Sequence, residues 1–394
     1  MSHDPYDANR PDPRRRDPDR HEQDRYPTHA EPDQAAGHDA SEALAERIRR
    51  AHANRTPLRI VGGDTKAFYG RRVDISGGGE ALSTTEHHGI VHYDPVELVV
   101  SVRAGTRLAT LEAALDAEGQ QLACEPPHFG AAATVGGMVA AGLSGPRRPW
   151  AGAVRDFVLG IRMIGHDGTQ LRFGGEVMKN VAGYDLSRLM VGAQGCLGVL
   201  TEVSFKVLPR PAATRSLRLA MPLETALERL AEWGRKPWPL SAASYHDGAL
   251  NLRLEGGAGS VAQTAGQLGG DALEDDYWTA LREQRLALFT SDDPRPLWRL
   301  SLPNNTPPLA LDGDVLYDWA GAQRWLKSDA PVASIRGAAA RAGGHASCFR
   351  AQHGANPDEP FTALTPVLAK YHQRLKQRLD PYGIFNPGRL YEAL

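Results

Sequence analysis

The sequence predicts an α+β protein that contains two α+β units and a tail. The chain has 394 residues, which is too long for one ordinary hydrophobic core and favours two domains. Short strand patterns and amphipathic helix patterns are interspersed along its first half. The pattern changes after the segment LPRPAATR, where a second series of helices and strands begins.

The first 40 residues contain no Val, Ile, Leu, Phe or Trp, and they are rich in Pro and in charges of both signs. Such a segment cannot bury enough apolar surface to offset the entropy lost on ordering. We therefore expect residues 1–40 to form a disordered, solvated tail. A docking arm is the alternative interpretation of this segment.

A helix is expected to open the first unit, residues 41–210, at the segment DASEALAERIRRAHANR. Asp39 or Ser41 would cap this helix, and Leu44 and Ile48 fall on one face at helical spacing. The segments PLRIVGG and VELVVSVRAG then have the apolar pattern of strands.

The segment TRLATLEAALDAEG predicts the next helix, with Thr106 as its N-cap and Gly119 as its C-cap. Its buried stripe would consist of Leu108, Leu111 and Leu115. The segment FVLGIRMIGHDGTQLRF predicts a β-hairpin that turns at Asp167 and Gly168. A further strand is expected at CLGVLTEVSFKVL.

The second unit is predicted over residues 211–355 as a smaller α+β domain. Its first helix, PLETALERLAEW, has Leu223, Leu227 and Leu230 at helical spacing. Strands are expected at GALNLRL and LWRLSLP, a strand and turn at GDVLYDWAGAQRWL, and a helix followed by a strand at PVASIRGAAARAGGHASCFR. Residues 356–394 would form a helix, with Leu375 and Leu379 facing inward, and a turn-rich end that returns to the first unit.

Composition excludes several classes of function. The formal net charge of −2 gives no electrostatic basis for binding nucleic acid or for a polybasic membrane anchor. The 3 cysteines are far apart and form no C-x-x-C, which argues against a disulfide scaffold and a self-contained iron–sulfur or structural zinc site. No apolar run approaches the roughly 20 residues of a membrane span, and no secretory signal pattern is visible. We expect a cytoplasmic protein.

Three glycine clusters punctuate the first unit. They lie at residues 61–70, directly after a predicted strand, at residues 131–145, and at residues 192–202. Glycine lets backbone N–H groups converge on one point and lets a ligand approach closely, which suits a pyrophosphate. A tight turn is the simpler interpretation of any single cluster, but three clusters in one unit favour a dinucleotide site shared by the first two.

The usual dinucleotide motifs are missing. No G-x-G-x-x-G opens a βαβ unit, so a Rossmann site for NAD is not supported. No G-x-x-x-x-G-K-[ST] is present, which excludes a P-loop. A dinucleotide bound without either motif suggests FAD in another fold.

Several long segments resemble the FAD-binding domain of the vanillyl-alcohol-oxidase or p-cresol-methylhydroxylase (PCMH) type. They are VGGDTKAFYG, DPVELVVSVRAGTRLATLEAAL, EPPHFGAAATVGGMVAAGLSGPRRPWAGAVRDFVLG, GEVMKNVAGYDLSRLMVGAQGCLGVLTEVSFKVLP and FNPGRLY. The resemblance implies an FAD-binding PCMH-type domain of two α+β subdomains, followed by a smaller α+β cap domain.

The resemblance also implies the residues that bind the cofactor. Gly62, Gly63, Asp64, Thr65 and Lys66 would form the pyrophosphate loop. The second loop would consist of Thr134, Val135, Gly136, Gly137, Gly142 and Ser144. The remaining implied positions are Asp156, Val158, Gly195, Leu197, Gly198 and Val199, with Asn386 close to the isoalloxazine. Some relatives hold FAD covalently through a His in the first loop; Asp64 stands at that place here, so we expect non-covalent FAD.

Within this family, SGPRRPWAGAVRDFVLG, LYDWAGAQRWL, GGHASCFR and HQRLKQRLDPYGIFNPGRLY resemble the E subunits of bacterial glycolate oxidases. This implies a complex that oxidises the small 2-hydroxy acid glycolate to glyoxylate, with a homologous flavoprotein D subunit and an iron–sulfur F subunit as partners. Any contact with the membrane would be indirect, through these partners. The alternatives are a stand-alone FAD-dependent 2-hydroxy-acid dehydrogenase and a non-catalytic assembly subunit with a degenerate flavin site.

The sequence departs from relatives that oxidise 2-hydroxy acids themselves. Those relatives carry an H-x-G-D-G-N-x-H stretch and a later E-H-G that bind a metal. Here His246 and His345 are single histidines in predicted strands, and we interpret each as packed or on the surface. We therefore expect no metal site, and we expect the D subunit to carry out the oxidation.

A few other side chains have two possible interpretations. Lys179, Tyr184 and Asp185 would line the flavin or mark a helix start, with Asp185 as its cap. The pair at residues 147–148, two arginines, would contact FAD phosphates or a partner, or lie in a solvated loop. We interpret Cys196 as a packed residue, because no His lies near it in the sequence.

Overall fold

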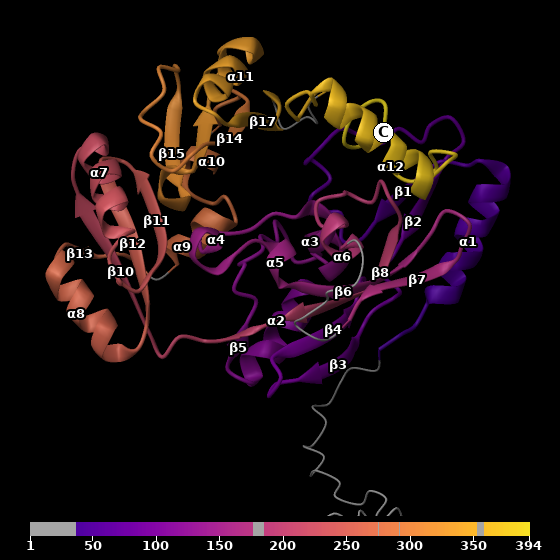
Figure 1. Ribbon diagram of the computed structural model, residues 1–394, viewed down its shortest axis with the longest axis horizontal. Coiled ribbons are helices and arrows are strands. Elements are labelled where there is room, and N and C mark those ends of the chain that lie inside the picture. The colour runs from indigo at the N-terminus through magenta and orange to yellow at the C-terminus, as the bar shows by residue number, and fades with distance from the viewer. Residues whose placement is uncertain (1–36, 176–184, 275, 291, 353–357) are drawn as a thin grey trace, which may run out of the picture. The chain divides into compact units, whose positions relative to one another are not determined.

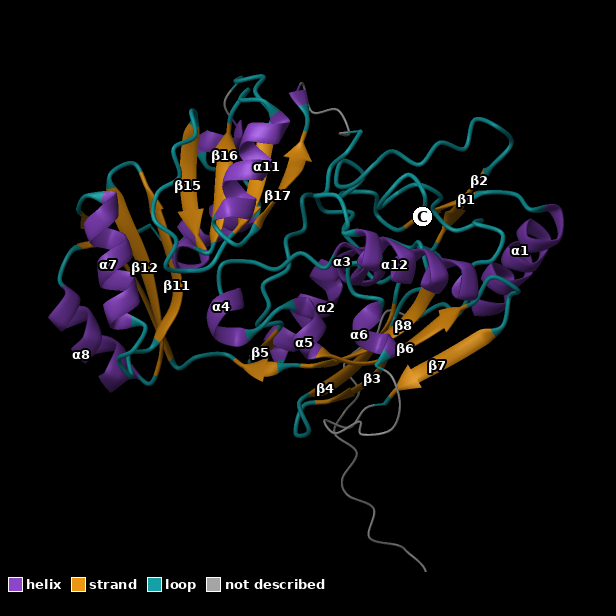
Figure 2. Cartoon of the chain, turned by 45° about the horizontal axis from the view of Figure 1, so that its top comes forward, coloured by secondary structure: helices purple, strands orange, loops and turns teal. Residues whose placement is uncertain are grey.

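The computed structural model describes residues 37–175, 185–274, 276–290, 292–352 and 358–394, and Figures 1 and 2 show its strands in separate groups. Nearly all of the predicted tail lies outside these residues. The mixture of helices and sheets confirms the predicted α+β class.

A five-stranded antiparallel sheet forms the centre of the first unit, in the order β3-β4-β8-β6-β7. Its strands are β3 (Ile90–Asp94), β4 (Val99–Arg103), β6 (Val158–Ile164), β7 (Gln170–Gly174) and β8 (Val199–Lys206). Helices α2 (Leu108–Ala117) and α3 (Val135–Ala141) contact each other, and α3 also contacts β4 and β8. The predicted stripe of Leu108, Leu111 and Leu115 is fully buried in this core.

A small parallel pair lies beside this sheet. Strand β1 (Leu58–Val61) pairs with β2 (Glu80–Ser83). Helix α1 (Ser41–Asn54) packs Leu44 and Ile48 into the same apolar cluster as Phe385. β1 therefore holds the start of the first glycine cluster against a well-packed core.

The C-terminal segment returns to the free edge of β1. The amide of Leu58 donates to Ile384 O at 2.6 Å, and the amide of Asn386 donates to Leu58 O at 2.9 Å. This return follows helix α12 (Pro366–Leu379), shown in yellow in Figure 1. These contacts place residues 384–386 beside β1; the division of the chain into domains stays a prediction.

An eight-stranded antiparallel sheet follows in the second half, in the order β13-β10-β12-β11-β15-β16-β14-β17. The strands are β10 (Ala213–Ala220), β11 (Leu240–His246), β12 (Ala249–Gly256), β13 (Asp271–Ala272), β14 (Leu297–Ser301), β15 (Asp314–Asp318), β16 (Gln323–Lys327) and β17 (His345–Arg350). Only Tyr245 and Tyr317 are in register between β11 and β15, so two four-stranded halves meet at a narrow joint.

Helices cover both halves of this sheet. Helices α7 (Leu223–Trp233) and α8 (Ala258–Leu268) share one apolar cluster with the first half, and α11 (Val332–Arg341) packs Ile335 against the second. The short helices α9 (Tyr277–Arg282) and α10 (Ala287–Thr290) lie in the segment that links the halves. The remaining short elements are α4 (Arg148–Ala151), α5 (Val154–Phe157), α6 (Leu186–Leu189), β5 (Gln120–Gln121) and β9 (Leu208–Pro209).

The predicted helix caps were wrong in detail. The N-cap of α1 is Ala40, while Asp39 Oδ1 accepts a hydrogen bond from the amide of Ser41. The N-cap of α2 is Arg107, because the hydroxyl of Thr106 is bonded to the backbone of residue 89 instead. α2 ends with Glu118 as its C-cap, and Gly119 follows it with φ 64°.

Most predicted elements are present, and the strands that were missed have a common cause. The hairpin that turns at residues 167–168 is confirmed by the pairing of β6 with β7. Helices α3, α8 and α9 were not predicted. Strands β2, β3, β10 and β11 were also missed, and the segment 314–327 contains two strands where one was expected. These strands are short or carry many small and polar residues, so their apolar alternation is weak.

Candidate functional site

The first glycine cluster forms a loop of open amides at the end of β1. Asp64 has φ 55°, in the left-handed region, whereas neither of its two neighbours in the chain has a positive φ. Within the part of the chain that the structure describes, the backbone N–H groups of residues 62–66 donate to no protein acceptor. Successive open N–H groups around a left-handed residue make a concave anion site.

The second cluster lies directly against this loop. A Cβ on Gly63 would stand 1.5 Å from Ala132 O, and one on Gly62 would stand 2.3 Å from Thr134 Oγ1. Thr134 caps α3, because its Oγ1 accepts from the amide of Gly137 at 3.2 Å. The run of small residues at 131–145 therefore allows two backbone segments to meet where side chains would collide.

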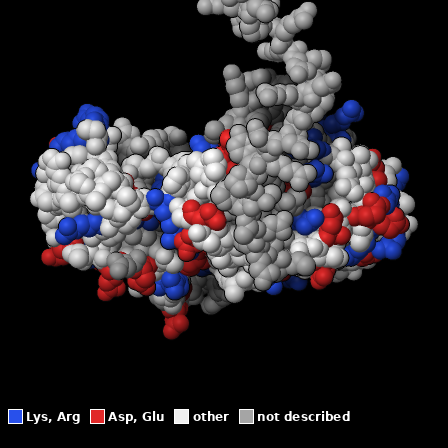
Figure 3. Space-filling view, turned by 90° about the horizontal axis from the view of Figure 1, so that it is seen from below, with Lys and Arg blue, Asp and Glu red and all other residues white. Residues whose placement is uncertain are grey.

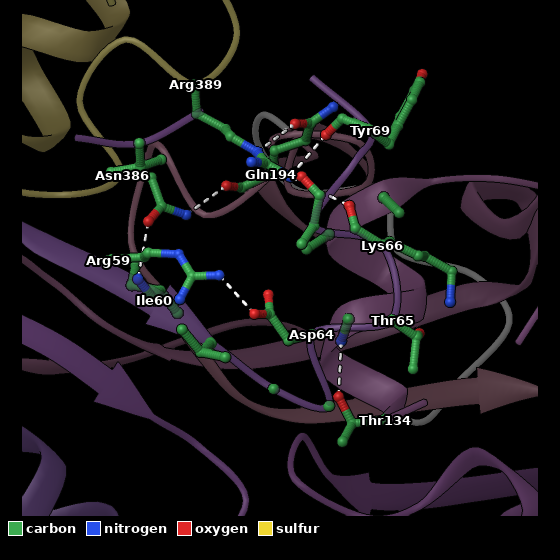
Figure 4. A pocket seen from close by; sticks show the side chains of 18 residues that line it. Arg59, Ile60, Asp64, Thr65, Lys66, Tyr69, Thr134, Gln194, Asn386 and Arg389 are labelled. Atoms are coloured by element: carbon green, nitrogen blue, oxygen red, sulfur yellow. Dashed lines mark hydrogen bonds and ion pairs between the residues drawn. The ribbon is translucent and has the colours of Figure 1, made fainter. Parts of the chain in front are cut away.

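Asn386 joins the third cluster to β1. Its Oδ1 accepts from the amide of Ile60 at 2.8 Å, and its Nδ2 donates to Gln194 O at 2.7 Å (Figure 4). A Cβ on Gly195, whose φ is 73°, would stand 2.6 Å from that Nδ2. The side chain of Asn386 thus fixes the distance between the C-terminal return and the third glycine cluster.

Two adjoining cavities lie between these three segments, and they enclose about 640 and 500 Å³ of empty space with their open mouths included. They share the lining residues Ile60, Gly62, Gly137, Ala140, Gln194 and Asn386. The open amides of residues 62–66 line the first cavity, while Ala104, Met190 and Leu200 make an apolar wall of the second. Together they form one cleft, with open amides in the first cavity and an apolar wall in the second, which suits a dinucleotide.

Arg389 is a residue of the site that the sequence did not single out. Its guanidinium donates to Gln194 Oε1 at 3.1 Å (Figure 4) and to four backbone carbonyls in and just after the first loop. These carbonyls belong to Lys66, Ala67, Tyr69 and Arg71. The only sequence signal was its place in FNPGRLY, three residues after Asn386.

Lys66 is half-buried at the edge of the first cavity. Its Nζ donates to His128 O at 3.1 Å and lies 5.7 Å from the centre of the Phe129 ring. Burial lowers the pKa of Lys66 to about 8, and the Glu283 carboxylate opposes that change. The Asp64 carboxylate faces outward to Arg59 instead, at 2.5 Å.

The structure divides the other implied residues into two groups. Gly136, Gly195 and Gly198 line the second cavity. Val135, Val158, Leu197 and Val199 are buried in the apolar clusters, and Gly142 ends α3 with φ 64°. Ser144 Oγ accepts from the amide of Val154, and Asp156 Oδ2 accepts from the amide of Ala153. The residues of this second group line neither cavity; a role for them at the cofactor stays a prediction.

The side chains with open interpretations have specific places. Asp185 caps α6, with its Oδ1 accepting from the amide of Arg188 at 3.0 Å. Arg147 is neither in a solvated loop nor at the cleft, because it is buried among Glu125 and Glu255. Arg148 lies over the ring of Trp319. Cys196 is a separate case, because burial raises the pKa of its thiol to about 11. Lys179 and Tyr184 lie outside the described residues.

The two single histidines do not form part of a larger ligand group in the described ranges. His246 ends β11 beside Asp247, and His345 begins β17. Across those ranges, no group of three or more His, Cys, Asp or Glu side chains is arranged to hold a metal ion.

The cleft and the fold define an FAD-binding protein of the PCMH type, and the comparisons agree. Residues 33–174 match the FAD binding domain family. The chain is 55% identical to glycolate oxidase subunit GlcE of Escherichia coli (strain K12) over 356 residues, which cover 90% of this chain and 99% of that one. The chain therefore belongs to the family of glycolate oxidase subunit GlcE.

Two further comparisons are more distant. Glycolate oxidase subunit GlcD of Bacillus subtilis (strain 168) is 32% identical over 36% of this chain and 30% of its own length. The solved structure of an alkyldihydroxyacetonephosphate synthase superposes with a TM-score of 0.62 at 15% identity, over 89% of this chain and 74% of that one. This second likeness concerns the fold alone.

One face shows basic and acidic side chains interspersed (Figure 3), in keeping with the formal net charge of −2. Among the described residues, none of the helices is both long and apolar enough to span a bilayer.

Proposed function

We propose that this chain is an FAD-binding subunit of a glycolate oxidase complex, in which glycolate is oxidised to glyoxylate and the electrons pass to a partner iron–sulfur subunit. FAD, when bound, would accept electrons and pass them on. In this proposal a homologous flavoprotein subunit oxidises the substrate, and the present chain relays electrons. The family supports the complex, and the open loop at residues 62–66 is the observation that carries the cofactor role.

The residues of the chain would bind and orient FAD without a covalent bond. The open amides of residues 62–66 would donate to the pyrophosphate, and Lys66 would add a positive charge at the edge of the same cavity. Arg389 would hold the conformation of the first loop by donating to the loop's backbone carbonyls. Asn386 would hold the third glycine cluster at a fixed distance from the C-terminal return. The apolar wall of the second cavity would exclude water from the rings.

The experiment uses the full chain, purified alone, with its visible spectrum recorded before and after glycolate is added without oxygen. We expect a yellow protein that stays oxidised until the partner flavoprotein subunit is added. A colourless chain that free FAD cannot reconstitute would overturn the cofactor role and favour an assembly subunit. Bleaching by glycolate alone would overturn the relay and make the chain a dehydrogenase in its own right.

A further inference from the structure

Helix α12, shown in yellow in Figure 1, exposes a patch of apolar side chains near its start. Val367, Leu368 and Tyr371 are 64%, 48% and 60% exposed. They are three of the eight large apolar side chains that are exposed in the described part of the chain, and no other helix or strand there has more than one. Single exposed apolar residues are ordinary, but a group of them on one element marks an interaction site.

The charge of α12 has a single sign. Between Pro366 and Leu379 the helix has four Lys and Arg side chains and no acidic one, in a chain whose formal net charge is −2. Lys376 is buried and pairs with Asp380. The exposed ones are Lys370, Arg374 and Arg378. Across the described residues none of these three pairs with a carboxylate, so the exposed face attracts an acidic surface.

Helical spacing puts apolar and basic side chains on one face. Four of them follow one another at intervals of four, three and four residues, which aligns them in one row along the helix. They are Val367, Tyr371, Arg374 and Arg378. Leu375 lies in the neighbouring row, which turns toward the protein. The exposed row therefore offers apolar contacts near one end of the helix and positive charge near the other.

A groove of about 220 Å³ lies beside this row, between α12 and the third glycine cluster. His372 is exposed at the helix side of the groove. The apolar walls are made by Leu189, Val191, Leu197, Leu375, Leu390 and Leu394. Protein partners commonly insert a large apolar side chain into such a pocket, with polar contacts around it. A membrane surface could cover the apolar patch, but it has no side chain to fill a groove.

One stretch of backbone separates this groove from the cofactor cleft. Gln194 and Gly195 line the cleft, whereas Ala193 and Cys196 line the groove. Lys376 holds α12 against the same stretch, because its Nζ donates to Cys196 O at 2.8 Å. Electron transfer slows steeply with distance, so a redox partner bound at the groove would be well placed to exchange electrons with a cofactor in the cleft.

We propose that the exposed face of α12 and the groove beside it form the docking surface for the iron–sulfur subunit of the complex. The contacting face of that subunit is acidic, to match the exposed basic side chains of α12, and it places an apolar or aromatic side chain in the groove. The identity of the partner rests on the proposed function, whereas the chemistry of its face follows from the charge and the apolar patch of this helix.

A second copy of the chain fits this surface less well. Two copies that met through α12 would set its basic row against the same row of the other copy. Like charges across an interface lower affinity and suppress the wrong pairing. An acidic partner has no such cost, and it gains from the attraction of Arg374 and Arg378.

The experiment measures binding of the purified iron–sulfur subunit to the full chain by biolayer interferometry, at low and at high salt. We expect Arg374→Glu to weaken binding by about tenfold or more at low salt, because the variant places a carboxylate against an acidic face. The difference should shrink at high salt, since exposed charges are screened. Val367→Ser should weaken binding at both salt concentrations, because it removes apolar contact area.

Each variant has a matched control outside α12. Arg215→Glu reverses an exposed arginine of β10 that forms no ion pair among the described residues. Val332→Ser changes a valine that is 48% exposed at the start of α11. Both controls should bind the subunit as the parent does. If Arg374→Glu bound it as tightly as Arg215→Glu, the docking surface would be overturned.

Further measurements on the same samples separate the other occupants and the cofactor role. Binding to vesicles of phosphatidylglycerol and phosphatidylcholine that depends on Arg374, without binding of the subunit, would overturn the proposal in favour of a membrane. A dimer in sedimentation that Val367→Ser dissociates would overturn it in favour of a second copy. A colourless chain that binds the subunit through α12 would keep the surface and remove the flavin relay. A yellow chain whose binding the α12 variants leave unchanged would keep the cofactor and overturn the surface. Melting temperatures exclude misfolding as the cause.

Discussion

Gly63 shows how much of the site depends on one missing side chain. Its Cβ would stand 1.5 Å from Ala132 O, a backbone atom that cannot rotate away. We expect Gly63→Ala to push the two glycine loops apart, weaken FAD binding by at least tenfold and lower the melting temperature. The measurements are an FAD titration followed by fluorescence quenching and a thermal melt.

The control is Gly77→Ala, because nothing lies within 4 Å of a Cβ at Gly77 and its φ is not in the left-handed region. An alanine there is expected to change stability by no more than about 0.5 kcal/mol. If Gly63→Ala bound FAD as tightly as Gly77→Ala does, the two loops would not share the pyrophosphate.

Residues next to a glycine motif could be predicted, and residues that act from a distance could not. Gly62, Gly63 and Thr134 follow from local sequence, because glycine spacing and a cap before a helix are short-range signals. Arg389 gains its role from backbone that lies hundreds of residues away along the chain. No period or motif in one sequence encodes such contacts.

At the scale of elements, α12 carries a buried charge on a helix that looks ordinary in sequence. Leu375 and Leu379 face inward in part, as predicted, but Lys376 is buried more deeply at 7% exposure. Its Nζ donates to Cys196 O and Phe385 O, both at 2.8 Å, and to Asp380 Oδ2 at 2.7 Å. One ammonium group thus connects the third glycine cluster with the C-terminal return.

We expect Lys376→Met to destabilise the protein by about 3–5 kcal/mol, because Asp380 would remain as a buried carboxylate without its cation. Urea unfolding measures the loss. Adding Asp380→Asn should restore part of it, since the unpaired charge is then gone. Lys370→Met, on the exposed face of the same helix, is the control; equal midpoints for the two single variants would contradict a structural role for Lys376.

Elements with a strong apolar period were predictable, and weak strands were not. The helices at 41–54 and 108–117 and the hairpin of β6 and β7 follow from local pattern. β10, with the sequence ATRSLRLA, becomes a strand because β12 pairs with it along its whole length. Tertiary pairing decides such cases, which is why propensity alone misses them.

On the scale of the whole chain, the predicted change after residue 210 falls between the two large sheets. β8 of the five-stranded sheet ends at Lys206, and β10 of the eight-stranded sheet begins at Ala213. The limits of the domains themselves stay a prediction. The sequence could not indicate how strongly the two parts are held together, because the residues that form ion pairs between them lie far apart along the chain.

Four charged side chains with little exposure form ion pairs between the two parts. Arg147 lies near both Glu125, at 3.5 Å, and Glu255, at 2.5 Å. Arg253 faces the same two carboxylates, at 2.8 and 3.5 Å. Each of the four side chains is at most 14% exposed. Glu125 and Arg147 belong to the first unit, while Arg253 and Glu255 lie on β12, so the ring of alternating charges crosses the junction.

We expect Arg147→Met to cost about 3–5 kcal/mol, because two buried carboxylates would then share one arginine. The destabilisation falls on the junction, so we expect calorimetric unfolding to show two transitions for the variant and one for the parent. The double variant Arg147→Met with Glu255→Gln, which again balances the charges, should recover much of the loss.

The control is Arg210→Met, which removes an arginine that pairs with Asp116 on the surface, with side chains 57% and 51% exposed. Surface pairs contribute about 0–1 kcal/mol and weaken in salt, whereas a buried ring is screened much less. A destabilisation by Arg147→Met that disappears in high salt, or that is no larger than the effect of Arg210→Met, would contradict a fastening role. A large, salt-insensitive loss would mean that the cofactor cleft and the second unit unfold as one body because of these four side chains.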